Sequence, residues 1–323
     1  MILNILRKTA VALTLLALTP LSWAQAYPSR PIKIIVPYGP GTAIDVIVRH
    51  LSEALTRQMG QPIIVENKAG ASGTIGTAFV ATSAPDGYTI LSDASTHTSG
   101  PAMLGKVPYD PVRDFAGITT ITESTLVLVV AKSSGINSVA DLVAAGKAKP
   151  GALTYASAGV GSSTHMTVEK FNAAAGIKAL HVPFKSTTDG LTEVLAGRVT
   201  YTYTGVASAV PMIRDNRLVP LAVGGFRRSA ALPGISTIEE AGIAGAGYPG
   251  WLGLMLPVKT PRDIVMRLHA EVTKAMTSPD MKEKLLKAGT DAWIMSPEEF
   301  DAMLKREMLE NEKLVKELNL KVQ

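Results

Sequence analysis

The stretch Val36–Asp45, which reads VPYGPGTAID, decides the fold class of this chain. The segment before it, IKIIVPY, is apolar like a buried strand, and the segment after it, IDVIVRHLSEALTRQMG, has apolar residues at helical spacing. Thr42 and Asp45 stand at capping-box spacing, and Gly39 and Gly41 leave the backbone open where the first turn of the helix has unpaired N–H groups. The stretch therefore predicts a strand, an anion-binding glycine loop and a helix.

The same order of elements recurs along the chain. The strand QPIIVEN, a glycine-rich loop, a short helix at 75–82 and the strand GYTILSD follow the first unit, which indicates an α/β fold with parallel strands. A second unit has a strand at 153–157, a loop with Gly159 and Gly161, and a helix with Met166 and Phe171. Two such units in two lobes would present two donor-rich loops across one cleft.

The length of the chain, 323 residues, favours two lobes, because single cores stop growing near this size. No linker divides the chain, but the apolar runs STLVLVVAKS and WLGLMLPV are candidates for segments that cross between lobes. We expect a first lobe at 27–125 and 254–323 and a second lobe at 126–253. Each lobe should hold a parallel or mixed sheet flanked by helices.

The N-terminus resembles a secretory signal peptide. Arg7 and Lys8 precede an apolar run, and Ala24 and Ala26 form a small-residue cleavage pattern. We expect cleavage after Ala26 and a free periplasmic protein; a retained membrane anchor is the alternative, although the run is short for a span. The chain has no cysteine, which excludes disulfides, thiolate metal sites and a lipoprotein anchor.

Charge and motifs narrow the function. Without the signal segment the formal net charge falls from +5 to +3, which argues against a nucleic-acid partner. G-x-S-x-G, P-loop and H-E-x-x-H motifs are absent, and both glycine pairs lack the third glycine of a dinucleotide fingerprint. We therefore expect no cofactor and no metal site.

Two histidines are the most chemically suggestive residues, His97 and His165. Each stands among hydroxyl residues without carboxylates at ligand spacing, so structural hydrogen bonding or ligand contact is favoured over metal binding or general-base work for His165. For His97 the structural interpretation is favoured more strongly. A secreted hydrolase with a Ser163/His165 pair in the cleft remains the alternative function.

Glycines and hydroxyl residues dominate the loops that follow the strands, and Lys185 is the one nearby cation. Backbone N–H groups, hydroxyls and water would then carry most of the recognition of an anion, which suits a reversible carboxylate better than a polyphosphate. The alternative is that these residues serve only in turns and helix caps.

Seven segments in one order carry a family resemblance: YPSRPIKIIVPYGPG followed by Asp45, MGQPIIVENKAGASGTIGT, APDGYTIL, VPYDPVRDF, GVGSSTHM, HVPFKS and LPGISTIEEAG. Over the whole mature chain they resemble the tripartite tricarboxylate transporter receptors, the Bug-type periplasmic solute-binding proteins. The resemblance implies a two-lobed flytrap fold, joined by two crossing strands, that closes around a small carboxylate. First-lobe loops would bind one carboxylate and second-lobe loops the distal part of the ligand.

The resemblance and the loops together give the expected ligand-binding residues: Tyr38, Gly39, Pro40, Gly41, Thr42, Asp45, Ala71, Ser72, Gly73, Thr74, Ser95, Thr96, Gly161, Ser162, Ser163, Thr164, His165, Lys185, Ser186, Thr187, Tyr203 and Thr204. Relatives often have Phe-Asp where this chain has Tyr203-Thr204, which argues against a cationic amino acid and for a ligand with a neutral or second anionic end, such as an aliphatic or aromatic dicarboxylate. Tyr201, Tyr203 and Trp251 are candidates for an aromatic slot, with core packing as the alternative.

The expected partners are the carboxylate ligand and integral-membrane permease subunits or a sensor kinase, with the protein itself a monomer. The tail from Ser296 and Pro297 reads as a long amphipathic helix with an N-cap and a first-turn proline. We expect it to pack on its own lobe, and a partner-binding face is the alternative.

Overall fold

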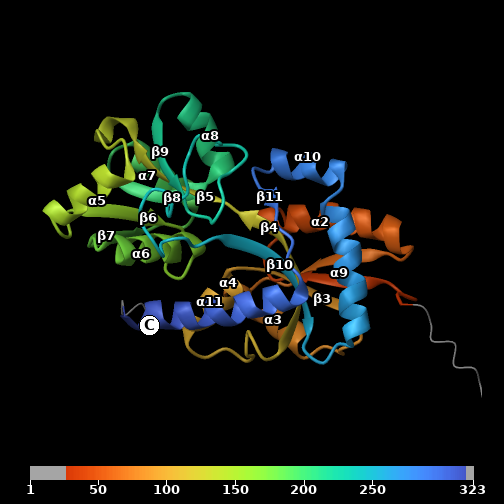
Figure 1. Ribbon diagram of the computed structural model, residues 1–323. Helices are drawn as coiled ribbons and strands as arrows, with labels where there is room; N and C mark the ends of the chain where they lie inside the picture. Colours follow the sequence, from red (N-terminus) through yellow and green to blue (C-terminus); the bar gives the residue numbers. More distant parts are fainter. Residues whose placement is uncertain (1–26, 318–323) are drawn as a thin grey trace, which may run out of the picture.

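The computed structural model describes residues 27–317, apart from the side chains of Ser72 and Ser124, and contains two β-sheets flanked by helices (Figure 1). The predicted signal segment lies outside the described residues. The elements before the first crossing are β1 (Ile32–Val36), α2 (Ala43–Met59), β2 (Ile63–Asn67), α3 (Thr74–Ala81), β3 (Thr89–Ala94), α4 (Thr96–Leu104) and β4 (Phe115–Ser124).

Nine elements then build the second sheet and its helices: β5 (Leu126–Ala131), α5 (Val139–Ala148), β6 (Leu153–Ser157), α6 (Ser163–Ala175), β7 (Ala179–Pro183), α7 (Thr187–Leu195), β8 (Tyr201–Gly205), α8 (Val206–Arg214) and β9 (Leu218–Val223). The chain returns to the first sheet through β10 (Gly250–Pro257), α9 (Arg262–Met276), α10 (Pro279–Lys287), β11 (Asp291–Ala292) and α11 (Pro297–Glu317).

The strand orders are β11-β4-β10-β3-β1-β2 and β7-β6-β8-β5-β9. In the first sheet β1 is parallel to β2 and β3, whereas β10 is antiparallel to β3 and β4. The second sheet repeats this mixture, because β6 is parallel to β7 and β8 while β5 is antiparallel to β8 and β9. The predicted fold class, two mixed α/β sheets, is confirmed.

We call the part built on the six-stranded sheet the first lobe and the part built on the five-stranded sheet the second lobe. The chain first passes between them at Thr125, between β4 and β5, and returns through the segment 224–249. The expected lobe boundaries stay a prediction: 125/126 falls at the first passage, and 253/254 falls inside β10, which pairs with β4 along its length.

Helix α2 shows why the opening stretch folds as it does. Its predicted apolar stripe is buried, from Ile44 through Val48 to Leu55, and joins the first-lobe core. Burial of each such side chain contributes about 1.5–3 kcal/mol. The helix ends where Gly60 takes a left-handed φ of 68° and donates its N–H to the Thr56 carbonyl. The strand and helix therefore hold the glycine loop from both sides.

Helix α11 begins at Pro297 after Ser296, as the sequence predicts. Its buried Phe300, Met303 and Leu304 pack in the first-lobe core beside β4, and its Asn311 and Leu314 lie against α4, so packing on its own lobe is confirmed. Figure 1 shows it running along α4 toward the second lobe. None of the helices within residues 27–317 is both long and apolar enough to cross a bilayer.

Candidate functional site

Three loops of the first lobe meet at Tyr38, directly after β1. Its hydroxyl donates to the Asp93 carboxylate at 2.7 Å and is hydrogen-bonded to the Thr96 hydroxyl at the start of α4. A Cβ on Gly73 would lie 3.5 Å from the Tyr38 ring, so the loop before α3 packs on the same side chain. The predicted segments 38–42, 71–74 and 95–96 are therefore brought together.

Asp45 holds the first glycine loop rather than facing outward. Its buried carboxylate accepts hydrogen bonds from the Gly41 N–H at 2.9 Å, from Arg49 at 2.9–3.0 Å and from the Asn67 amide at 2.9 Å. The Arg49 hydrogen bond is the largest cause that lowers the pKa of Asp45 to about 2. The carboxylate is thus ionised and internally satisfied, which suits a residue that positions the loop.

The capping-box expectation is wrong in both of its hydrogen bonds. The Thr42 side chain makes no capping hydrogen bond to α2; its hydroxyl donates instead to the Gly39 carbonyl at 3.0 Å. The reason is that Asp45 engages the N–H of Gly41, one residue earlier than a capping box requires. Within residues 27–317 the N–H groups of Thr42, Ala43 and Ile44 donate no hydrogen bond, so three donors at the start of α2 are unpaired.

The second-lobe loop, 159–164, is the counterpart between β6 and α6. Ser162 caps α6 by accepting from the His165 N–H at 3.2 Å, and its own hydroxyl donates to the Gly159 carbonyl at 2.7 Å. The Thr164 hydroxyl accepts from the Ala158 N–H at 3.0 Å. In the described part of the chain the N–H groups of Ser163 and Thr164 carry no hydrogen bond, so the predicted donor loop is present here too.

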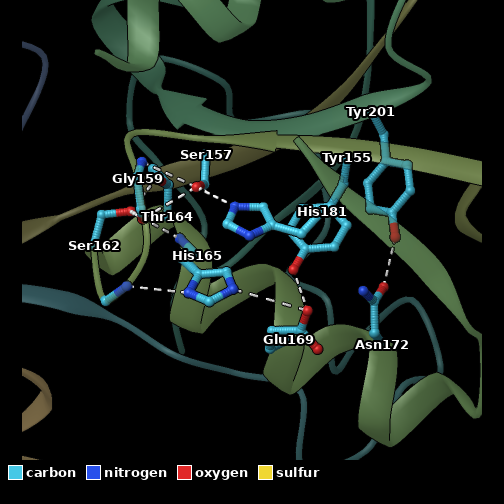
Figure 2. Close-up of polar contacts among 11 residues, drawn as sticks. Tyr155, Ser157, Gly159, Ser162, Thr164, His165, Glu169, Asn172, His181 and Tyr201 are labelled. Carbon is cyan, nitrogen blue, oxygen red and sulfur yellow. Dashed lines mark hydrogen bonds and ion pairs between the residues drawn. The ribbon is translucent and has the colours of Figure 1, made fainter. Parts of the chain in front are cut away.

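His165 lies under this loop, not in front of it. Its ring is 1% exposed, its Nδ1 accepts from the Gly161 N–H at 3.1 Å, and its Nε2 lies 4.0 Å from Glu169 (Figure 2). No hydrogen bond among the described residues joins it to the Ser163 hydroxyl, whereas a hydrolase pair needs one. The geometry therefore gives no support to the alternative hydrolase.

His97 has a structural role, as predicted. The buried ring places Nδ1 3.2 Å from the Asp93 carboxylate and Nε2 2.8 Å from the Pro111 carbonyl. Both nitrogens are occupied by its own lobe. Among residues 27–317, acidic and histidine side chains form no group of three or more that could hold a metal ion.

The remaining predicted residues lie at the carboxyl ends of β7 and β8. Ser186 caps α7 by accepting from the Asp189 N–H, beside exposed Lys185 and half-buried Thr187. Gly159 reaches this region, because a Cβ there would lie 3.6 Å from the Phe184 carbonyl. Thr204 is buried in β8, and its hydroxyl has no hydrogen-bond partner in the part of the chain described.

The aromatic slot is not formed by the expected rings. Tyr201 and Tyr203 are fully buried in the second-lobe core, where the Tyr201 hydroxyl donates to Asn172 at 2.6 Å. Trp251 is 1% exposed and donates its indole N–H to Glu307 at 2.7 Å. Burial therefore supports the core-packing interpretation of the three rings. Ligand contact by Tyr203 or Thr204 stays a prediction, as does the rest of the expected set; of Ser72 only the backbone is described.

Two contacts connect the lobes near the site. A Cβ on Gly161 would lie 3.5 Å from Met103 of α4, and Lys170 of α6 forms an ion pair with Glu310 of α11 at 2.9 Å. The second-lobe loop thus lies beside α4, the helix whose other end begins at Thr96. The loops of the two lobes are brought to one region of the molecule.

Sequence reasoning missed several residues that support these loops: Asn67, Asp93, Tyr155, Glu169 and His181. Asp93 was readable, since an acidic residue at the end of a buried strand is typical of a site edge. The stacking of His181 on His165 has no signal in the sequence, because the two residues come from different elements.

Comparisons with known proteins agree with this geometry. The model of the tripartite tricarboxylate transporter family receptor matches residues 47–320. The UPF0065 protein in the tcbD-tcbE intergenic region of Pseudomonas sp. strain P51 is 35% identical, over 98% of this chain and 96% of its own length. Protein BugT of Bordetella pertussis is 31% identical over 85% of each chain.

Solved structures show the same fold. A TctC solute-binding protein from Polaromonas, without ligand, has a TM-score of 0.83 at 28% identity and covers 90% of this chain and 99% of its own. An R. palustris protein with adipate has a TM-score of 0.73 at 29% identity and covers 90% of this chain and 97% of its own. MatC from Rhodopseudomonas palustris with bound malate has a TM-score of 0.71 at 27% identity and covers 90% of this chain and 100% of its own. The chain belongs to the tripartite tricarboxylate transporter receptor family, as a Bug-type solute-binding protein.

Proposed function

We propose that this protein is a periplasmic receptor that closes its two lobes over a small organic dicarboxylate. The observation that carries the proposal is the pair of helix N-termini, α2 and α6, each with a glycine loop and N–H groups that have no hydrogen bond within residues 27–317. A helix N-terminus favours a carboxylate through its dipole and its unpaired donors. Two of them, one per lobe, suit a ligand with two anionic ends.

The nature of the ligand follows from what surrounds these donors. The carboxylates nearest to them, Asp45 and Glu169, are engaged by internal partners. At the second site the nearby cation Lys185 is exposed. Hydroxyls and amides therefore supply most of the recognition, which favours reversible binding. The neighbours solved with adipate and malate support an aliphatic dicarboxylate as the class.

Delivery to a tripartite tricarboxylate-type permease, or presentation to a sensor kinase, completes the proposal and rests on family membership. Secretion with cleavage after Ala26 and a monomeric state belong to it as well. Closure stabilised by a ligand that bridges both lobes is the mechanism, because a ligand shifts an open–closed equilibrium by its differential affinity for the two states.

The test is thermal unfolding of the mature chain with adipate, malate, aromatic dicarboxylates, the corresponding monoamides and a set of amino acids. Binding to the native state alone raises stability by about 2.7 kcal/mol at a ligand concentration of 100 times Kd. We expect a concentration-dependent rise with one dicarboxylate and a much smaller rise with its monoamide. A rise with amino acids alone would overturn the dicarboxylate assignment.

A further inference from the structure

The second lobe contains a stack of three rings directly beneath its glycine loop (Figure 2). The His165 and His181 rings are nearly parallel, at 13°, with centroids 4.1 Å apart, and the Tyr155 ring packs against both, with its centroid 4.8 Å from His181 and 6.2 Å from His165. The three residues come from α6, β7 and β6 respectively, so the stack joins three elements that end at the loop.

Both imidazoles connect to N–H groups of this loop. The Gly161 N–H donates directly to His165 Nδ1 at 3.1 Å. His181 Nε2 lies 2.6 Å from the Ser157 hydroxyl, and that hydroxyl accepts from the Gly159 N–H at 3.1 Å. Gly159 and Gly161 have φ values of 104° and 79°, which side chains rarely adopt, so these two hydrogen bonds hold a backbone shape that is specific to glycine.

The hydrogen bond to Gly161 fixes the protonation state of His165. A backbone N–H only donates, so Nδ1 must present a lone pair, and the proton of the neutral ring sits on Nε2 toward Glu169. A second proton would place an N–H on Nδ1 against the N–H of Gly161. The hydrogen bond would then become a repulsion between two donors.

The surroundings keep the pair neutral at ordinary pH. Burial, followed by the neighbouring His181, lowers the pKa of His165 to about 4, and burial also lowers the pKa of His181. The titratable groups that face the rings are Glu169 on α6 and Tyr155 on β6, besides the two histidines themselves. Tyr155 donates to Glu169, whose pKa is raised by burial, so this carboxyl is a poor counter-charge for an imidazolium.

We propose that His165 is a positioning residue that holds the second-lobe ligand loop in its binding shape only while it is neutral, and that His181 supports the same loop through Ser157. The proposal rests on the proposed function for its ligand, but the loop geometry is measurable without one. The histidines act through the Gly159 and Gly161 amides and leave the N–H groups of Ser163 and Thr164 aimed at the ligand. Ligand capture is then lost as His165 gains a second proton.

The sign of the pH effect follows from the lowered pKa. Folded His165 binds its second proton more weakly than unfolded histidine does. Its stabilisation of the loop shape is therefore fully present above about pH 6.5 and is lost as pH falls toward 4. Affinity for a dicarboxylate should follow the same course.

The first experiment uses the ligand-free mature protein. Two-dimensional NMR follows the Gly159 and Gly161 amides from pH 8 to pH 4 in the wild type, in His165→Asn and in His165→Leu. Asn offers a neutral acceptor near the position of Nδ1, so we expect wild-type amide shifts at pH 7.5 without the acid transition. His165→Leu should displace the Gly161 signal at every pH. An acid transition of the Gly161 amide that persists in His165→Asn, or an unmoved Gly161 signal in His165→Leu, would overturn the proposal.

The second experiment measures adipate binding by calorimetry over the same pH range, with His269→Asn on α9 as the matched control. At a given pH the protonation of adipate is the same in all samples, so it cancels when the Kd of each variant is divided by the Kd of the wild type. We expect His165→Leu to bind adipate about 3- to 10-fold more weakly than wild type at pH 7.5, which corresponds to the loss of one hydrogen bond. The adipate affinity of His165→Asn relative to wild type should rise as pH falls. If the amides respond as expected but adipate does not bind, the ligand class fails while the positioning role stands. Equal pH profiles for wild type and His165→Asn would refute that role.

Discussion

Glu123 at the end of β4 and Arg227 just after β9 form an ion pair at 2.9 Å that joins the two passages of the chain between the lobes. The Glu123 side chain is 4% exposed and that of Arg227 is 55% exposed. Burial raises the pKa of Glu123, and Arg227 partly offsets this effect. Gly225 packs on the same carboxylate. The ion pair therefore ties the two passages together between the lobes.

Replacing Gly225 with alanine tests this tie. A Cβ there would lie 2.2 Å from the Glu123 carboxylate, which would have to move and give up its ion pair. We expect Gly225→Ala to lower the free energy of unfolding by about 1–3 kcal/mol, because it leaves a buried charge poorly paired. Urea unfolding measures the loss. Gly234→Ala is the matched control, since nothing lies within 4 Å of its Cβ; equal stability of the two variants would contradict the role of the pair.

The ion pair between Lys170 and Glu310 links α6 of the second lobe to α11 of the first. Because both side chains are partly exposed, charge reversal of either one should weaken adipate binding by no more than about fivefold, and less at high salt. Lys170→Glu combined with Glu310→Lys should recover the affinity. Calorimetry at two salt concentrations measures this.

The exposed pair Glu283 and Lys287 on α10 supplies the control. Exchange of its charges should leave adipate affinity unchanged at both salt concentrations. A double reversal of Lys170 and Glu310 that binds no better than the single variants would show that the pair does not stabilise the bound arrangement of the lobes.

Replacing Lys185 tests whether uncharged hydrogen-bond donors or a positive charge supply most of the ligand's binding energy. If amides and hydroxyls dominate, Lys185→Ala should cost less than about fivefold in affinity, as expected for an exposed charge. Lys178, exposed next to the opposite end of β7, gives the control variant Lys178→Ala. A hundredfold loss in Lys185→Ala alone would replace the amide-based site with a cation-based one.

The sequence predicts the parts of this site that depend on local order. The apolar spacing of α2 and the glycines around Thr42 and Ser162 are contiguous in the chain, so strand, loop and helix follow from periodicity and turn chemistry. The hydroxyl-rich loops are recognisable for the same reason. Their common location follows from parallel strands, whose carboxyl ends share one edge of a sheet.

The parts that the sequence does not predict depend on tertiary contacts. The internal hydrogen bonds of Asp45 are one example, because Asn67, which binds its second oxygen, comes from strand β2 and is 22 residues away in the chain. Tyr201 and Trp251 look like cleft residues until Asn172 and Glu307 bind their polar ends within the core. Such polar partners let aromatic residues be buried completely, and their choice is not encoded in spacing.

Glu307 gives a prediction for stability against pH. This buried carboxyl on α11 accepts the indole N–H of Trp251, and desolvation raises its pKa to about 7 from 4.5. Because the folded protein binds this proton more tightly than the unfolded chain, the contribution of Glu307 is fully present below about pH 4.5 and is lost as pH rises through 7. The loss is at most about 3 kcal/mol.

Glu307→Gln should remove that dependence, because the amide oxygen still accepts from Trp251 without gaining charge. We expect the variant to gain stability relative to wild type between pH 5 and pH 8, measured by urea unfolding at each pH. Glu312 is exposed on the same helix, so Glu312→Gln is the control, and its free energy of unfolding should vary with pH as that of the wild type does. Parallel curves for wild type and Glu307→Gln would mean that Glu307 is already ionised in the folded protein at pH 5. The α4–α11 interface would then hold a buried charge stabilised by Trp251 and its neighbours.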